Sequence, residues 1–143
     1  MTAPPAQAPS LQELVENFAF LEDWPARYEY LLDLGKHLGG LRDVEKNDAS
    51  RVHGCMSQVW LVLEYAPTTG VRVRADSDAF LVRGLLAVLQ SAYEGLSLEA
   101  ALKLDPAAIL GEIGLQAHLS ASRRNGLGAM IARIRTLLAA ADQ

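Results

Sequence analysis

The sequence is poor in the groups that most often carry chemistry. Among its 143 residues there is one cysteine, Cys55, and the three histidines are far apart. A single thiol excludes an internal disulfide, and without a Cys-x-x-Cys or His-x-x-x-His pair we predict no metal site. A phosphate-binding glycine loop is also absent, because Gly39 and Gly40 are placed to end a helix rather than to follow a strand.

Two further absences bear on location and partners. No apolar run approaches the roughly 18 residues of a membrane span, and the first basic residue is Arg27, so we expect neither a membrane anchor nor a signal peptide with a basic start. The 13 Lys and Arg residues are scattered and outnumbered by 17 Asp and Glu residues, for a net charge of −4. That balance argues against a nucleic-acid or anionic-membrane partner. The expected compartment is the cytoplasm.

Half of the residues are hydrophobic, which together with the length predicts one domain with a core of its own. Residues 1–9 have no apolar period and are predicted to form a disordered tail, so the single domain spans residues 10–143. Downstream, apolar residues recur at helical spacing behind residues that cap helices. The predicted helix starts are Ser10, Asp23, Asp78, Ser97, Asp105 and Ser120. Gly39 and Gly40 are predicted to end the second helix.

The middle of the chain alternates with a period of two instead. Residues 59–65 place apolar side chains on one parity, residues 67–70 form a turn, and residues 71–76 alternate again, which predicts an antiparallel hairpin. A short third strand at residues 51–53 would complete the sheet, because two strands alone are marginally stable. The expected fold class is α+β, with a small antiparallel sheet of about three strands covered by helices.

Cys55 is the reactive residue that remains. Its plain interpretation is that an unpaired cysteine behaves as a small buried hydrophobe. Three features favour a chemical role. Gly54 gives the adjacent backbone freedom, Cys55 shares the parity of Val59 and should rest its sulfur against the core side of the sheet, and no second cysteine exists to resolve an adduct. A sheltered thiol beside a flexible glycine is suited to hold a labile sulfur.

Cys55 stands in a long motif that is followed by two further matches in the same order. The three stretches are Arg51-Val52-x-Gly54-Cys55-x-Ser57-Gln58-Val59-Trp60, Asp76-Ser77-Asp78-Ala79 and Ser122-Arg123-x-x-Gly126-Leu127-x-Ala129-Met130. With them the chain closely resembles the SufE family of cysteine desulfuration proteins, from about Ser10 to the C-terminus. The resemblance implies a fold similar to that of the IscU-type scaffold.

The resemblance also implies a function. SufE-family proteins accept sulfur as a persulfide from a pyridoxal-phosphate cysteine desulfurase of the SufS type and stimulate that enzyme. They pass the sulfur to the SufBCD complex, which assembles iron–sulfur clusters. The protein would then be a sulfurtransferase-like carrier rather than a stand-alone enzyme. It would need no cofactor of its own, because the pyridoxal phosphate belongs to the partner.

Residue by residue, Cys55 matches the persulfide-bearing cysteine of the family, and Arg123 matches an arginine ahead of the last helix that lies near the active loop. The expected supporting residues are Gly54, His53 and Gln58, and the expected partner-binding residues are Asp76 and Asp78. Two positions depart from the family pattern, with His53 for a frequent Glu and Ala121 for a frequent Pro. Arg123, the start of the last helix or a protonated His53 would each favour the Cys55 thiolate that must attack a donor sulfur.

Two other functions fit the sequence less well. An interaction module would dock on a desulfurase and stimulate it without carrying sulfur, and a thiol enzyme would use Cys55 with a histidine. The thiol enzyme needs an orienting third group and an oxyanion site, for which the sequence shows no signature. A cluster scaffold is least favoured, because one cysteine cannot supply the several thiolates that a cluster usually needs.

Overall fold

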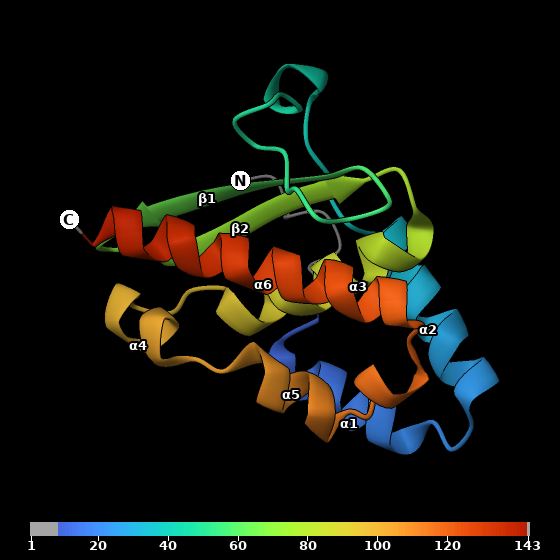
Figure 1. The fold of residues 1–143 in the computed structure, drawn as a ribbon. Helices are drawn as coiled ribbons and strands as arrows, with labels where there is room; N and C mark the ends of the chain where they lie inside the picture. Colours follow the sequence, from blue (N-terminus) through green and yellow to red (C-terminus); the bar gives the residue numbers. More distant parts are fainter. Residues whose placement is uncertain (1–8, 143) are drawn as a thin grey trace, which may run out of the picture.

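The structure is a computed structural model that describes residues 9–142, so residues 1–8 and 143 lie outside the described part. Of the predicted tail only Pro9 is described, and its carbonyl oxygen accepts a hydrogen bond from the Ser91 hydroxyl at 2.9 Å. The elements in chain order (Figure 1) are α1 Leu11–Phe20, α2 Trp24–Lys36, the 3-10 turn η1 Asp43–Glu45, β1 Val59–Ala66, β2 Gly70–Ser77, α3 Phe80–Tyr93, α4 Leu98–Lys103, α5 Pro106–Glu112, the 3-10 turn η2 Gln116–His118 and α6 Ala121–Ala141.

Local capping chemistry sets where most helices begin. At the starts of α1, α2, α4, α5 and α6 the predicted side chain accepts a backbone N–H, which confirms those starts. The capping residues are Ser10, Asp23, Ser97, Asp105 and Ser120. α3 begins at Phe80, two residues after the predicted start at Asp78, and its cap position, Ala79, makes no side-chain bond. The second helix ends at Lys36, ahead of the glycines predicted to stop it.

β1 and β2 pair antiparallel along their whole lengths, which confirms the predicted hairpin. The predicted third strand is wrong. Within the described residues, the chain at 51–53 makes a single isolated bridge, from Arg51 to Trp60. It goes no further because Gly54, with a φ of 90°, turns the backbone away from the sheet. The fold class α+β is confirmed, and the sheet has two strands rather than three.

One face of the hairpin packs against α3 and α6, and the hydrophobic core fills the space between them (Figure 1). Val59 and Leu61 on β1 and Val71 and Val73 on β2 are at most 1% exposed. Tyr65, predicted on the same apolar face, is 39% exposed beside the hairpin turn. Along β1, burial is therefore deepest where the chain enters the strand.

α2 crosses α3 at a point where both helices carry glycine. A β-carbon at Gly84 would stand 2.2 Å from the carbonyl oxygen of Leu31, and one at Gly35 would stand 2.5 Å from the carbonyl oxygen of Phe80. These distances leave no room for a side chain, so the two glycines set the close approach of the helices. The crossing fixes α3, which forms a wall of the pocket described below.

Residues 41–51, which include η1, cover the other face of the hairpin (Figure 1). Arg74 on β2 donates two hydrogen bonds to the Glu45 carboxylate, at 2.6 and 2.9 Å. These bonds, and then a hydrogen bond from the backbone N–H of Arg42, lower the pKa of Glu45 to about 2. The segment that leads toward Cys55 is thus fixed to the sheet by ion pairing.

Asp76 on β2, predicted to bind a partner, also holds residues 41–51 on the sheet. It is 5% exposed, its carboxylate accepts the Leu41 backbone N–H at 3.0 Å, and it pairs with Lys46 at 3.2 Å and with Arg83. Burial opposes ionisation, but these hydrogen bonds and charges prevail and hold the pKa of Asp76 below its ordinary value. Direct contact with a partner does not fit this burial, so we assign Asp76 a structural role.

Candidate functional site

Cys55 lies in the loop of residues 53–58 that leads into β1, and this loop packs against α6. The thiol is half-buried, and its S–H donates to the backbone carbonyl oxygen of Gly126 at 3.6 Å. A β-carbon at Gly126 would stand 3.6 Å from the Cys55 Sγ and 4.0 Å from its Cα. Glycine at this point of α6 therefore leaves the sulfur uncovered by a side chain from the helix.

The loop is fastened at both ends. The Val52 N–H donates to the carbonyl oxygen of Val59 at 2.8 Å, and the Gln58 N–H donates to the Asp78 carboxylate at 3.0 Å. Between these points Gly54 makes the turn with its φ of 90°. The thiol is therefore held in the middle of a short, closed loop.

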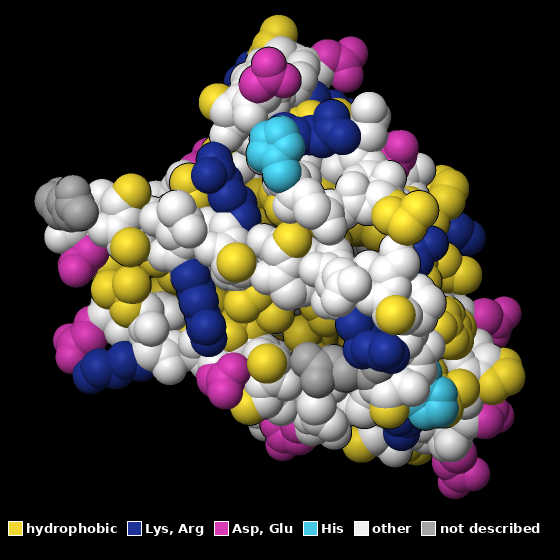
Figure 2. Space-filling model, viewed as in Figure 1, with side chains coloured by type: hydrophobic (Ala, Val, Ile, Leu, Met, Phe, Trp, Pro, Cys, Tyr) yellow, Lys and Arg dark blue, Asp and Glu magenta, His cyan; other side chains and the backbone are white. Residues whose placement is uncertain are grey.

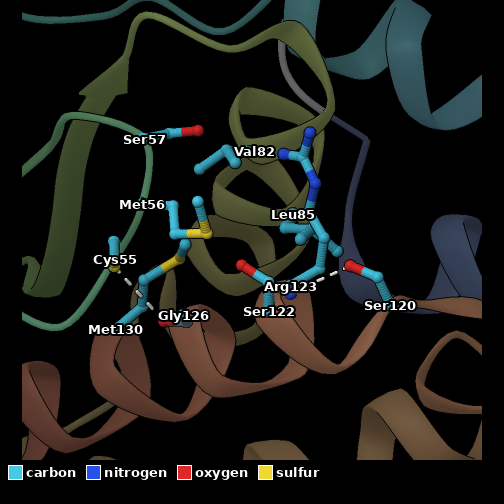
Figure 3. Close-up of a pocket in the computed structure, with 10 residues that line it drawn as sticks. All are labelled: Cys55, Met56, Ser57, Val82, Leu85, Ser120, Ser122, Arg123, Gly126 and Met130. Carbon is cyan, nitrogen blue, oxygen red and sulfur yellow. Dashed lines mark hydrogen bonds between the residues drawn. The ribbon is translucent and has the colours of Figure 1, made fainter.

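A pocket of about 460 Å³ opens beside the sulfur, between the loop, α3 and the first half of α6 (Figure 3). Its apolar wall comes from Val82 and Leu85 on α3 and Met130 on α6, and its polar edge includes Arg123. The serines that line it are Ser57, Ser120 and Ser122. Met56, the neighbour of the thiol, also lines the pocket and is 90% exposed. The thiol therefore has an apolar shelter on one side and solvent close by on the other.

Burial raises the pKa of the Cys55 thiol, and the positive charge of Arg51 partly opposes that rise. Residues 53–58 are not strand, so the parity of β1 does not set the direction of Cys55, but the sulfur faces Gly126 on α6, on the core side of the hairpin where it was expected. Cys55 also packs against the hydrophobic core. The shelter predicted from the sequence is present, but a helix supplies it.

Arg123 reaches the same pocket from the first turn of α6. Its backbone N–H donates to the side chain of Ser120, the helix cap, at 3.2 Å. One guanidinium nitrogen, Nη1, is buried without a hydrogen-bond partner among the described residues. Figure 3 shows this side chain directed toward Val82, with Cys55 at the opposite end of the pocket beside Gly126. The structure brings Arg123 and Cys55 to one pocket without pairing them.

The other predicted residues surround the loop. Asp78 and Gln58 are exposed, and they fasten the loop through the Asp78 carboxylate and the Gln58 backbone. His53 is exposed on the loop itself. Sequence reasoning assigned no role to Arg51 and Gly126, although both stand in the quoted motifs, because their nearness to the sulfur depends on how the loop packs on α6.

The histidines are spread over the fold. His37 lies beside Asp33, and the ring of His118 stacks on Trp24 with 3.7 Å between ring centres. Across residues 9–142, no group of three or more His, Cys, Asp and Glu side chains is arranged to hold a metal ion. None of the helices in the same range combines the length and the apolar character needed to span a bilayer.

Most of the chain matches one known family. A family model described as the Fe-S metabolism associated domain, SufE, matches residues 12–138. The chain belongs to the SufE family. An uncharacterized SufE-like protein of Rhizobium meliloti (strain 1021) is 39% identical to it over 130 residues, covering 89% of this chain and 93% of that one. A SufE-like protein of Rhizobium etli is 40% identical over 132 residues, covering 88% and 87%.

The fold of this SufE chain also has a counterpart among solved structures. It is similar to the solution structure of a hypothetical protein from Thermus thermophilus, with a TM-score of 0.73, 25% identity, and coverage of 92% of this chain and 94% of that one. The resemblance drawn from the three motifs is confirmed. Family membership associates the protein with iron–sulfur metabolism.

Proposed function

We propose that this SufE protein is a sulfur carrier. It accepts persulfide sulfur on Cys55 from a cysteine desulfurase of the SufS type, stimulates that enzyme, and delivers the sulfur to a SufBCD-type scaffold for cluster assembly. The observation that carries the proposal is the position of the one thiol of the chain, half-buried at the side of a pocket in a glycine-turned loop. Membership of a family associated with iron–sulfur metabolism supports it.

The transfer needs only the two sulfur centres. The Cys55 thiolate attacks the outer sulfur of a cysteine persulfide on the desulfurase. A sulfur–sulfur bond forms at Cys55 while the bond between the two donor sulfurs breaks, and the donor cysteine leaves as a thiolate. The oxidation level moves with the sulfur, so no outside oxidant or reductant takes part. Stimulation follows, because each transfer returns the donor cysteine to its free state.

The pocket protects the thiol before loading and the persulfide after it, but it does not present the sulfur to another protein. Apolar Val82, Leu85 and Met130 beside the sulfur keep water from one side of it. The raised pKa of Cys55 keeps most of the thiol protonated and unreactive in the free protein. Transfer therefore requires the loop to move the sulfur outward, and Gly54 is the residue whose backbone can absorb that rotation.

Chemistry of other kinds has less support. A thiol hydrolase would need a histidine oriented on Cys55, but His37 lies beside Asp33 and His118 stacks on Trp24. His53 is exposed on the loop, and among the described residues the thiol bonds Gly126 rather than this histidine. Since the pyridoxal phosphate of the reaction belongs to the desulfurase, this chain is proposed to work without a resident cofactor. The cytoplasm is the proposed compartment.

The test is direct loading of the full chain. Incubated with a cysteine desulfurase and free cysteine, the wild type should gain about 32 Da by intact mass, the mass of one sulfur atom. Cys55→Ser should fold, because Ser is close to Cys in size, and should gain nothing. The gain should also disappear on treatment with cyanide, which removes sulfane sulfur. If the folded Ser variant raised alanine release by the desulfurase to the wild-type level, the protein would be an interaction module that carries no sulfur.

A further inference from the structure

Charge is distributed unevenly over the molecule. The chain has a net charge of −4, yet α6 contains four arginines and no Asp or Glu. The four are Arg123, Arg124, Arg133 and Arg135. The rest of the chain contains the other nine of the 13 basic residues and all 17 acidic residues. A strongly positive helix is therefore carried by an acidic protein, and that helix is the one that contacts Cys55.

These arginines are largely left without carboxylate partners among the described residues. Arg124 and Arg133 donate to backbone carbonyl oxygens, of Leu119 and Ala49 respectively, which do not cancel their charge. Arg135 approaches the Asp105 carboxylate only at 3.9 Å, and both side chains are more than half exposed. In an exposed pair of this kind, the carboxylate offsets little of the positive charge of the arginine.

Helix stability does not explain the placement. Cations near the N-terminus of a helix oppose its dipole, and α6 has arginines but no acidic residue in its first turns. Two helices follow the stabilising arrangement, α1 with Glu13 in its first turn and α4 with Glu99 in its first turn and Lys103 in its last, whereas the first turns of α2, α3 and α5 contain no acidic residue either. The helix dipole therefore does not account for the arginines at the start of α6.

Two of these arginines lie on the side of α6 that faces the Cys55 loop. Arg123 lines the Cys55 pocket, and Arg133 reaches the segment that leads into the Cys55 loop, seven residues beyond Gly126 and so on the same face of α6. Figure 2, viewed from the α6 side, shows dark blue side chains on both sides of this helix and magenta ones mostly at the margin of the face. Any protein that meets Cys55 must cover part of this surface.

We infer that the arginines of α6 form an electrostatic docking surface for the sulfur donor, which presents acidic side chains around its own reactive cysteine. This inference rests on the proposed function. Complementary charge raises the rate of encounter and aligns the partners, and the effect weakens as salt screens it. A protein partner fits better than a nucleic acid, because the net charge of −4 repels a polyanion outside this one face.

The test compares variants of equal charge change. Arg124→Glu/Arg133→Glu reverses two charges on α6, and Arg72→Glu/Lys103→Glu reverses two on the hairpin and α4, where the wild-type residues pair with Glu94 and Glu99. Loading of Cys55 by a desulfurase at limiting concentration is followed by intact mass at low and high salt. A small cysteine persulfide serves as a second donor that needs no docking. Arg124→Gln/Arg133→Gln covers the case in which the first variant fails to fold.

We expect the α6 reversal to slow loading from the desulfurase about tenfold at low salt, with the difference shrinking at high salt. The Gln pair should show a smaller loss, the control pair should match the wild type, and all variants should load equally from the small persulfide. Equal loading of the α6 and control variants from the desulfurase would overturn the docking surface while leaving the carrier intact. Failure of the wild type to load from either donor would overturn the carrier itself.

Two other outcomes would assign the surface elsewhere. If the α6 variants loaded normally but failed to pass sulfur to a scaffold, the arginines would serve the recipient and the donor assignment would be wrong. Binding of the wild type to a short DNA duplex, lost in the α6 variants while loading stayed normal, would identify a nucleic-acid surface.

Discussion

At the sulfur atom, burial and charge act in opposite directions on ionisation. Burial raises the pKa of Cys55, and Arg51 from the start of the same loop region opposes it. Arg123, which the family resemblance places near the active loop, shares the pocket but points toward α3 (Figure 3). The cation that acts on the resting thiol is therefore Arg51.

A comparison of two substitutions tests this assignment. Arg51→Gln should raise the pKa of Cys55 further, because it removes the charge that favours the thiolate. The midpoint of Cys55 alkylation against pH should move upward in that variant and stay in place in Arg123→Gln. A shift in Arg123→Gln as large as that in Arg51→Gln would contradict the assignment.

The glycine beneath the sulfur, Gly126, lies in the interior of α6. Gly126→Ala places a methyl group 3.6 Å from the Cys55 Sγ, whereas Gly128→Ala meets nothing within 4 Å. Both changes remove a glycine from a helix interior and should raise the free energy of unfolding by up to about 1 kcal/mol. Only Gly126→Ala should slow alkylation and sulfur loading, because only that methyl group covers the sulfur. Equal alkylation rates in the two variants would show that the contact does not matter.

Among the contacts between elements, the crossing of α2 and α3 has the least room for an added side chain. A β-carbon at Gly84 would overlap a backbone oxygen, and a backbone atom cannot move aside as a flexible side chain does. Because α3 supplies Val82 and Leu85 to the pocket, a shift of this crossing also reaches the site.

Gly84→Ala should therefore lower the free energy of unfolding by about 3 kcal/mol, since an overpacked contact forces the two helices apart. Gly111→Ala on α5 is the matched control, because nothing lies within 4 Å of the added carbon. Urea unfolding of both variants measures the difference. If Gly84→Ala unfolded at the same urea concentration as Gly111→Ala, the crossing would be looser than the structure shows.

Features set by neighbours in sequence could be predicted, and those set by distant contacts could not. Five helix starts followed from a capping residue and the turn behind it, and the hairpin followed from its alternation. The third strand failed because the turn at Gly54 ends pairing after one bridge. The shelter of Cys55 depends on Gly126, 71 residues away, and only the motif marked that position.

Over the whole molecule, ion pairs hold residues 41–51 on the face of the hairpin opposite α3 and α6. The carboxylates involved are Glu45, with its pKa lowered to about 2, and Asp76, whose pKa is also lowered. A carboxylate with a depressed folded-state pKa stabilises the fold above its unfolded pKa and loses that contribution as pH falls through the folded value. The molecule therefore loses stability on the acid side.

The expected pH window follows from Glu45. Its ordinary value of 4.5 and folded value of about 2 place the loss between about pH 5 and pH 2. Glu45→Gln should flatten the decline in the free energy of unfolding over this range, and Arg74→Gln should flatten it similarly, because either change removes the same pair. Urea unfolding at successive pH values measures both. Curves parallel to that of the wild type would show that the pair contributes nothing.

The two fastenings of the loop that carries Cys55 also set how far the sulfur can travel. Cys55 stands three residues beyond Val52 and three before Gln58, the two bonded ends. A fully extended residue spans at most about 3.6 Å, so the Cα of Cys55 can swing only about 11 Å from either end while both bonds hold. The loop is a short tether. Under the proposed function, a donor sulfur sunk deep in its own protein is beyond that reach, so the donor must carry its sulfur outward on a projecting segment.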